Sequence, residues 1–371
     1  MSWEERIVGV EALRPYLQNK SEPDFRSLVE GLIEQQLATW PMLRDAVAGL
    51  ARVEYKRLSA RGSEVLAQFN PQRIVSTAAK VDAATIKQRP CFLCAGNLPP
   101  EERGIEFGED FVALCNPFPV LPQHLVITSR RHIPQTIEGN FGTLLDLALD
   151  LGGEYFVVYN GAACGASAPD HLHFQACERK WLPILREIES WDRRILSRDT
   201  EAKEFVVPPS GGKGLVSRSL PPEGGTTNSR SAEIETFTLK DYRLNALIAR
   251  GNGRAALTEW FDRALRLLAE VTGADSEPMI NLVVTRDGDR WTVIVFPRSK
   301  HRPDRYFAEG DAKLTVSPAA IDLSGVLVAP QPDHFAKITS RDVEEIYAEV
   351  TLDEARFGSV AEDLSYEYSQ D

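Results

Sequence analysis

A short run of alternating polar and apolar residues is the feature that most constrains this chain. The run from Asp170 to Ala176 places Leu172 and Phe174 between polar residues, which predicts a β-strand. Because successive side chains on a strand point to opposite faces, His171, His173 and Gln175 share one face. Unpaired imidazoles are unfavourable inside a protein, so this face needs a phosphate group or a metal ion as its partner.

A loop of small residues leads into this strand. Between Asn160 and Pro169 the chain contains Gly161, Gly165 and Ser167. Glycines let backbone amides approach an anionic group closely, and the serine hydroxyl adds a donor. The alternative is an ordinary glycine-rich connection between two strands, but this loop runs directly into the histidines. We therefore expect it to contact a phosphate group.

The cysteines indicate a metal site. Cys91-x-x-Cys94 presents two thiolates on a tight turn, as in the first half of many zinc sites. A thioredoxin-type motif would need a helix after the second cysteine, and Pro99-Pro100 disfavour one. Among the six histidines we predict His132 and His171 as the third and fourth ligands. Two buried apolar thiols remain the alternative. The other cysteines are expected to be packing residues: Cys115, Cys164 and Cys177.

Composition excludes several classes of protein. The chain has 371 residues, of which 43% are hydrophobic and 26% charged, as in an ordinary globular protein. Its net charge of −12 has the wrong sign for sequence-blind binding to nucleic acid. No leader-like or membrane-spanning apolar run is found, so we expect a cytoplasmic protein that binds no membrane.

Periodicity along the chain predicts an α+β protein with two lobes. Residues 1–68 are expected to be a helical segment, 69–207 a catalytic lobe, 208–232 a flexible linker and 233–371 a second lobe. In the first lobe a helix over Phe141–Leu151 precedes a strand over Tyr155–Tyr159. The order of helix, strand, connection and strand recurs after the linker, where Arg286-Asp-Gly-Asp predicts a hairpin turn. We infer two homologous lobes, each with an antiparallel sheet flanked by helices.

These motifs together resemble the galactose-1-phosphate uridylyltransferase branch of the histidine-triad superfamily. The resemblance rests on His171-x-His173-x-Gln175 with Asn160, Gly165 and Ser167 before it, on Cys91-x-x-Cys94, on Arg131-His132-Ile-Pro, and on the strand after Pro122-Gln-His124. From Arg89 to Gln175 the chain is still more similar to a bacterial group, the domain of unknown function 4922, which is allied to sugar-nucleotide phosphorylases.

The resemblance implies roles for individual residues. His173 would be the nucleophile, Gln175 would donate its amide to a phosphoryl oxygen, and Ser167 would be a further donor. Cys91, Cys94, His132 and His171 would bind a structural zinc ion. Specificity for uracil or galactose does not transfer, because this chain departs from the uridylyltransferases in its helical N-terminus and between the two histidines.

The second lobe is expected to lack this chemistry. Its corresponding strand carries Trp291, Val293 and Val295 where the first lobe has the three polar residues. A basic cluster with Lys300 and Arg302 follows, and it is either a solvated loop or a grip for substrate phosphates. His124 is expected to pack or hydrogen-bond beneath the site.

The leading hypothesis is a ping-pong nucleotidyltransferase or phosphorylase. Neutral His173 would attack the α-phosphorus of a nucleoside diphosphate sugar or dinucleoside polyphosphate, and phosphate or a sugar phosphate would accept the nucleotidyl group. A nucleotide hydrolase and a non-catalytic, zinc-stabilised nucleotide-binding protein are the alternatives. The sequence leaves the base, the sugar, the acceptor and the oligomeric state open, a homodimer included.

Overall fold

The computed structural model describes residues 1–17, 22–79, 82–190, 234–239 and 242–367. The expected linker, residues 208–232, lies outside the described residues, as does the end of the expected first lobe, residues 191–207. Within the described part of the chain, no helix combines the length and the apolar character that crossing a bilayer requires.

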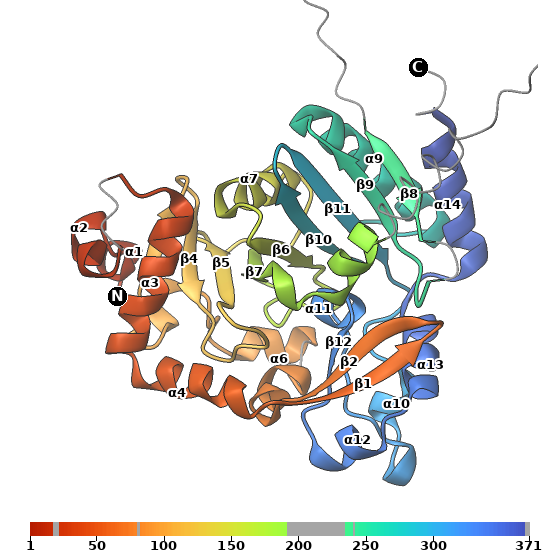
Figure 1. Cartoon of the computed structure of the whole chain (residues 1–371), viewed down its shortest axis with the longest axis horizontal. Helices are drawn as coiled ribbons and strands as arrows, with labels where there is room; N and C mark the ends of the chain where they lie inside the picture. Colours follow the sequence, from red (N-terminus) through yellow and green to blue (C-terminus); the bar gives the residue numbers. More distant parts are fainter. Residues whose placement is uncertain (18–21, 80–81, 191–233, 240–241, 368–371) are drawn as a thin grey trace, which may run out of the picture.

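A nine-stranded antiparallel sheet forms the centre of the molecule (Figure 1). Its strands lie in the order β3-β4-β5-β7-β6-β10-β11-β9-β8. Their bounds in chain order are β3 (Gly104–Phe107), β4 (Phe111–Cys115), β5 (Leu125–Ser129), β6 (Tyr155–Asn160), β7 (His173–Glu178), β8 (Glu235–Thr238), β9 (Leu247–Gly251), β10 (Ile280–Asp287) and β11 (Arg290–Pro297). The expected α+β class with antiparallel pairing is confirmed.

The sheet contains the same four-stranded unit twice. In spatial order, one unit is β4-β5-β7-β6 and the other is β8-β9-β11-β10. Along the chain, each unit has one helix between its second and third strands. The two units join edge to edge, because β6 pairs with β10. The two sheets expected from the sequence are therefore halves of one continuous sheet. The boundaries of the two lobes remain a proposal.

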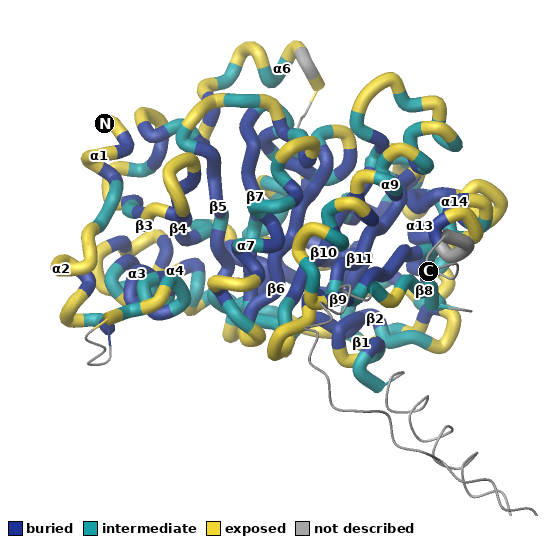
Figure 2. Tube along the Cα trace, turned by 90° about the horizontal axis from the view of Figure 1, so that it is seen from above, coloured by how far each residue is buried: buried dark blue, intermediate teal, exposed yellow. Residues whose placement is uncertain are grey.

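Helices cover one face of this sheet. They are α3 (Phe25–Thr39), α7 (Phe141–Leu151), α9 (Arg254–Thr272) and α14 (Glu354–Glu367). Their apolar residues form one buried cluster with Leu172, Phe174 and Ala176 of the histidine strand. Figure 2 shows the strands as the most deeply buried part of the molecule. His173 of β7 therefore lies on the face of the sheet opposite these helices.

Local signals in the sequence set the ends of these elements. Helix α7 ends at Gly152 and α9 at Gly273, and both glycines have a positive φ. Gly288, also with positive φ, lies in the two-residue turn that joins β10 to β11. Asp24 is the N-cap of α3, and its carboxylate accepts a hydrogen bond from the Ser27 amide at 2.8 Å.

The helical N-terminal segment is confirmed only in part. Helices α1 (Trp3–Arg6), α2 (Val10–Leu13), α3 and α4 (Pro41–Gly49) are present, but β1 (Glu54–Ala60) and β2 (Ser63–Phe69) replace helix over the rest of residues 1–68. Arg61 and Gly62 both have positive φ, which a two-residue hairpin turn requires. The prediction of helix for residues 54–68 is therefore wrong, because this turn and the alternating burial of β2 favour a hairpin.

This hairpin belongs with the C-terminal part of the chain. Strand β2 pairs in parallel with β12 (Val326–Val328) in a separate three-stranded sheet. That sheet packs with α11 (Ala320–Leu323), α12 (Pro332–Lys337) and α13 (Ser340–Val350) on the histidine side of the large sheet. Three further helices of the described residues are short: α5 (Ile74–Thr77), α6 (Ala83–Gln88) and α10 (Asp304–Phe307). Segments from both ends of the sequence thus cover the face on which the histidines lie.

The expected alignment of β11 with the histidine strand β7 needs a correction. Trp291, Val293 and Val295 pack in the helix-side cluster with Leu172 and Phe174, so they do not face the histidine side. Ile294 and Phe296 of β11 belong to the cluster on that side instead. A shift of one residue along a strand moves every side chain to the other face. The expected consequence is unchanged, since these residues are also apolar.

A fully buried arginine joins β11 to its surroundings. Arg298 donates to the carbonyl oxygens of Pro318, Lys300, His301 and Val350 and to the side chain of Asn281. Asn281 in turn donates to the side chain of Asn160 at 2.9 Å. Arg298 therefore connects Lys300 and His301 to Pro318, just before α11, and through Asn281 to the end of β6.

We expect Arg298→Met to lower the free energy of unfolding by about 3 kcal/mol or more, because several buried acceptors lose their donor at once. Urea denaturation followed by circular dichroism measures the change. Arg266→Met, at an exposed position of α9, is the matched control and should change it by less than about 0.5 kcal/mol. Equal effects of the two variants would contradict this role.

Candidate functional site

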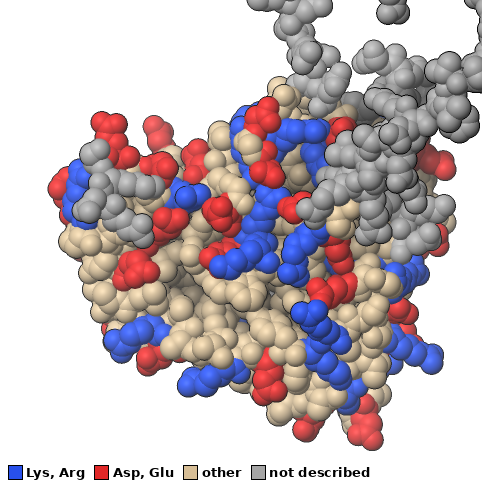
Figure 3. All heavy atoms as spheres, viewed as in Figure 1, with Lys and Arg blue, Asp and Glu red and all other residues tan. Residues whose placement is uncertain are grey.

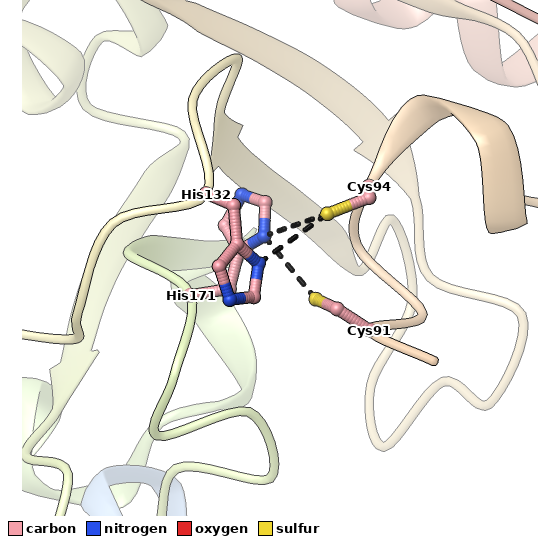
Figure 4. A group of neighbouring side chains, drawn as sticks. All are labelled: Cys91, Cys94, His132 and His171. Carbon is pink, nitrogen blue, oxygen red and sulfur yellow. Dashed lines mark hydrogen bonds between the residues drawn. The ribbon is translucent and has the colours of Figure 1, made fainter. Parts of the chain in front are cut away.

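Four predicted metal ligands converge on one point. Cys91 and Cys94 come from the loop before β3, His132 follows β5, and His171 lies just before β7 (Figure 4). Their ligand atoms all lie within 4.8 Å of one another. Cys91 Sγ is 3.2 Å from His171 Nδ1, and Cys94 Sγ is 3.4 Å from His132 Nδ1 and 3.6 Å from His171 Nδ1.

These spacings suit a tetrahedral cation. With metal–sulfur bonds of about 2.3 Å and metal–nitrogen bonds of about 2.0 Å, neighbouring ligand atoms on a tetrahedron lie about 3.5 Å apart. His171 Nε2 donates to the Ser129 carbonyl at 2.8 Å, which leaves Nδ1 as the coordinating nitrogen. The Asp170 carboxylate lies 3.6 Å from His132 Nε2. The four side chains form a cluster that could hold a metal ion.

His173 is the first residue of β7, so His171, two residues earlier, lies just before the strand and not on it as expected. Its side chain is only 4% exposed. Its Nδ1 lies 2.8 Å from the carbonyl oxygen of His171. A carbonyl only accepts, so Nδ1 carries the proton and Nε2 keeps a free lone pair. Burial lowers the pKa of His173 to about 4, so the imidazole is neutral at neutral pH.

A glutamine that the sequence analysis missed holds the backbone of this strand. Gln135 Oε1 accepts from the His173 amide at 2.8 Å, and Gln135 Nε2 donates to the carbonyl oxygens of His173 and Asn160. Gln135 is buried. It thereby joins the end of β6 to the start of β7 at His173. No pattern in the sequence identifies it, because it lies in a loop after His132.

His124 orients Gln175. The Val120 amide donates to His124 Nδ1 at 3.1 Å, so Nε2 carries the proton and donates to Gln175 Oε1 at 2.7 Å. Burial lowers the pKa of His124 to about 3, which keeps the ring neutral. The oxygen of Gln175 is thus occupied, and its amide hydrogens are the groups left to face a ligand. The expected position of His124 beneath the site is confirmed.

Two cavities meet on this face of the sheet. The larger, of about 630 Å³, is lined by His173 and by many apolar side chains, among them Phe92 and Phe118. The smaller, of about 60 Å³, is mostly polar and contains residues from both halves of the chain. Five residues line both cavities: Arg73, Ser76, Ala79, Ser167 and Gln175. The larger volume lies in the usual range for small-molecule sites.

The small-residue loop lies where the two cavities meet. Ser167 lines both, while Asn160 and Gly165 line the smaller one. Gly165 has a φ of 114°, and a Cβ there would lie 2.7 Å from Ala319. Arg89 donates to the Ser167 carbonyl at 2.8 Å and faces Asp170 at 3.7 Å. The loop thus packs against Ala319 of the C-terminal half and is bound by Arg89 of the N-terminal half.

Two of the predicted substrate-binding residues line neither cavity. Gly161 packs against β10, where an added Cβ would lie 2.9 Å from the Ile280 carbonyl oxygen. Lys300 turns away and pairs with Glu349 and, at 2.8 Å, with Asp304. Both expectations need correction, because local packing and acidic neighbours draw these residues away from the cavities.

The rest of the basic segment does reach the smaller cavity. Arg302 lines it, together with His301 and Ser317. The Arg302 guanidinium donates to Ser317 Oγ at 3.0 Å and to the carbonyl oxygens of Thr77 and Ala79. Burial lowers the pKa of His301 to about 4, so this ring is neutral. Figure 3 shows Lys and Arg side chains over the middle of this face, although the chain is acidic overall.

Other residues of the cavities had no signal in the sequence. Arg73 lies in a turn of 3₁₀-helix, Pro71–Arg73, that leads into α5. Asn97 and Glu102 line the larger cavity, and burial raises the pKa of Glu102 to about 8. Only folding brings these positions together.

Comparison with protein families identifies the two halves of the chain. Residues 32–178 match the family described as domain of unknown function (DUF4922). Residues 221–370 match the family described as GDPGP1-like, C-terminal domain. The resemblance inferred from the sequence is confirmed, and the DUF4922 match contains all four residues of the metal-type cluster as well as His173 and Gln175.

Several solved structures are similar at low identity. Yeast Ap4A phosphorylase Apa2 in complex with AMP is 14% identical, with 86% of this chain and 96% of that chain covered and a TM-score of 0.49. A uridylyltransferase mutant is 12% identical, with 84% and 99% covered and a TM-score of 0.38. A DUF4931 family protein from Bacillus cereus is 14% identical, with 57% and 93% covered and a TM-score of 0.32. No curated protein matches the chain.

We expect Cys94→Ser to abolish metal retention, because the cluster loses one of its two thiolate ligands. Elemental analysis of the purified proteins should find about one metal ion per wild-type chain and less than about a tenth of that in the variant. Cys115→Ala, which changes a buried cysteine outside the cluster, is the control and should keep the metal. Metal-free wild-type protein from metal-supplemented cultures would contradict this prediction.

Proposed function

We propose that the protein is a nucleotidyltransferase of the phosphorylase type that acts through a covalent nucleotidyl-histidine at His173. The observation that carries the proposal is the hydrogen bond from His173 Nδ1 to the His171 carbonyl, which leaves Nε2 with a free lone pair on a residue that lines the larger cavity. A neutral imidazole in this tautomer is a ready nucleophile and needs no separate base.

The proposed substrates are a nucleoside diphosphate sugar or a dinucleoside polyphosphate. The larger, mainly apolar cavity has room for a nucleoside, and His173 lies on its wall. The smaller polar cavity continues from it across Ser167 and Gln175. A chain of phosphates running from one cavity into the other would place the α-phosphorus beside His173.

The first step exchanges one bond to phosphorus for another. Nε2 of His173 supplies an electron pair to the α-phosphorus, and the bond from that phosphorus to the bridging oxygen breaks, so the phosphorylated leaving group takes its electron pair. The imidazole becomes cationic, and the His171 carbonyl that accepts from Nδ1 stabilises this charge. An oxygen of phosphate or of a sugar phosphate then attacks the same phosphorus and releases His173.

Donors around the phosphorus would stabilise the charge on its oxygens. The amide of Gln175, oriented by His124, and the hydroxyl of Ser167 both line the cavity wall next to His173. Asn160 and the loop at Gly165 border the adjoining polar cavity. Phosphoryl transfer depends mainly on positioning and electrostatic stabilisation, which such fixed donors provide.

We propose that the cluster of Cys91, Cys94, His132 and His171 holds zinc. Two thiolates and two imidazoles at tetrahedral spacing suit this ion. When bound, zinc would fix the cysteine loop to the start of β7 and would hold His171, whose carbonyl orients His173.

His173→Ala should abolish formation of a nucleotidyl-enzyme adduct and slow turnover by about 10⁴-fold or more, because the step then has no nucleophile. Wild-type and variant protein are incubated with UDP-, ADP- and GDP-glucose labelled in the α-phosphate, and the adduct is located by peptide mass spectrometry. His334→Asn is the control, because His334 lies outside both cavities. The asparagine side chain can still accept the hydrogen bond from the Thr315 amide.

An adduct on another residue, or turnover by His173→Ala, would contradict the nucleophile. Turnover that proceeds equally with and without phosphate or sugar phosphate would favour the hydrolase. Tight nucleotide binding without any adduct or turnover would favour the non-catalytic nucleotide-binding protein.

The pH dependence of adduct formation gives an independent test. An imidazole attacks only when it is unprotonated, and burial lowers the pKa of His173 from its ordinary value to about 4. Single-turnover rates in a rapid-quench apparatus should therefore agree within about twofold between pH 5.5 and pH 7.5. A rate that falls with a midpoint near pH 6.5 would show an ordinary, solvated histidine and would contradict the geometry described above.

A further inference from the structure

We infer that Arg73 is a catalytic residue that binds the β-phosphoryl group of the substrate and stabilises the leaving group, an inference that rests on the proposed function. Arg73 is one of the five residues that line both cavities, so it lies where the polyphosphate would pass from one to the other. It precedes α5 and follows the β1–β2 hairpin, outside the loop and strand that carry the other proposed donors.

The guanidinium of Arg73 has little to bind within the protein. Its Nη1 donates to the Phe118 carbonyl at 2.7 Å, and its buried Nε has no partner. Among the described residues no carboxylate forms an ion pair with it. The nearby carboxylate of Asp322 accepts instead from the amides of Ala319 and Val328. A guanidinium offers five donor hydrogens, so most of them remain for a ligand.

This environment is unfavourable for a cation that serves only the fold. Arg73 is half-buried, and this burial lowers its pKa to about 10, so the side chain is partly desolvated yet still charged at neutral pH. A partly desolvated charge without an ion-pair partner is unfavourable unless a ligand supplies the opposite charge. The residue therefore fits an anion-binding role, and phosphate is the anion that guanidinium groups bind best through paired hydrogen bonds.

The other basic groups of the smaller cavity are less free to bind the anion. Arg302 already donates to Ser317 and to two backbone carbonyls. His301 is neutral, because burial lowers its pKa to about 4. Lys300 lies outside the cavity in its ion pairs. Among the described residues that line the smaller cavity, Arg73 is thus the cation with the most uncommitted donors. Arg89 lines only the larger cavity, and it faces the Asp170 carboxylate at 3.7 Å.

The position of Arg73 matches the charge that develops in the reaction. The α-phosphoryl group beside His173 also borders Gln175, and Arg73 lies with Gln175 on the shared wall of the two cavities. As the bond to the α-phosphorus breaks, negative charge accumulates on the bridging oxygen and the β-phosphoryl group. A fixed cation at that point stabilises the transition state more than the bound substrate.

The test compares nucleoside diphosphates with monophosphates of the same base. Isothermal titration calorimetry with AMP and ADP, GMP and GDP, and UMP and UDP first finds the pair that wild-type protein binds most tightly. Arg73→Met should weaken binding of that diphosphate by about 10- to 100-fold and binding of the monophosphate by less than about threefold. Arg73→Lys keeps the charge, and its affinity for the diphosphate should lie between those of wild-type protein and Arg73→Met. Arg57→Met, on the exposed face of β1, is the control and should change neither affinity.

Stability separates a binding role from a structural one. Because Arg73 is a partly desolvated cation without an ion-pair partner, Arg73→Met should leave the urea midpoint unchanged or raise it. A clear fall in that midpoint, or equal losses of affinity for monophosphate and diphosphate, would overturn the inference.

The two proposals can fail separately. An adduct on His173 that forms at the wild-type rate in Arg73→Met would overturn the role of Arg73 and leave the proposed nucleophile intact. Selective loss of diphosphate binding in Arg73→Met, in a protein that forms no adduct, would support the Arg73 site and contradict the covalent mechanism. If no nucleotide binds, pyrophosphate is the probe, and equal affinity of wild type and Arg73→Met for it would overturn the inference.

Discussion

The hydrogen bond from His173 Nδ1 to the His171 carbonyl is the contact on which the chemistry of the site depends. It selects the tautomer in which Nε2 is free, and burial keeps that nitrogen unprotonated. The bond exists because β7 starts where a metal-type cluster holds His171, while Gln135 holds the backbone of His173 from the other side. The cluster and His173, the proposed nucleophile, are thus connected by the short backbone segment from His171 to His173.

The continuous sheet explains why one half of the chain is not a complete site. β6 pairs with β10, and Asn160 at the end of β6 is held by Asn281 and by the Ala320 amide from the C-terminal half. The smaller cavity is closed by His301, Arg302 and residues around α11. The second four-stranded unit lacks the polar strand, and the segment that follows β11 supplies the other wall of the smaller cavity. The site therefore needs residues from both halves of the chain.

Much of the site could be predicted because its residues are close in sequence or have a characteristic spacing. The period of a strand puts His173 and Gln175 on one face, and the Cys-x-x-Cys motif indicates the metal-type cluster. Arg73, Gln135 and Glu102 could not be found in this way. Only tertiary packing brings Arg73 and Glu102 to the cavities and Gln135 to the backbone of His173. Lys300 was expected in the site on its charge alone, and its acidic neighbours bind it elsewhere. The hairpin at residues 54–69 and the face of Trp291 were missed because both depend on strand register, which a single sequence specifies weakly.

The stereochemical course at phosphorus tests the covalent mechanism most directly. A nucleoside diphosphate sugar with a chiral α-phosphorothioate is converted by wild-type protein in the presence of phosphate, and the configuration of the product is determined by phosphorus NMR. Transfer through His173 inverts the phosphorus twice, so the account predicts net retention. Net inversion would mean a single direct displacement and would contradict a nucleotidyl-histidine intermediate.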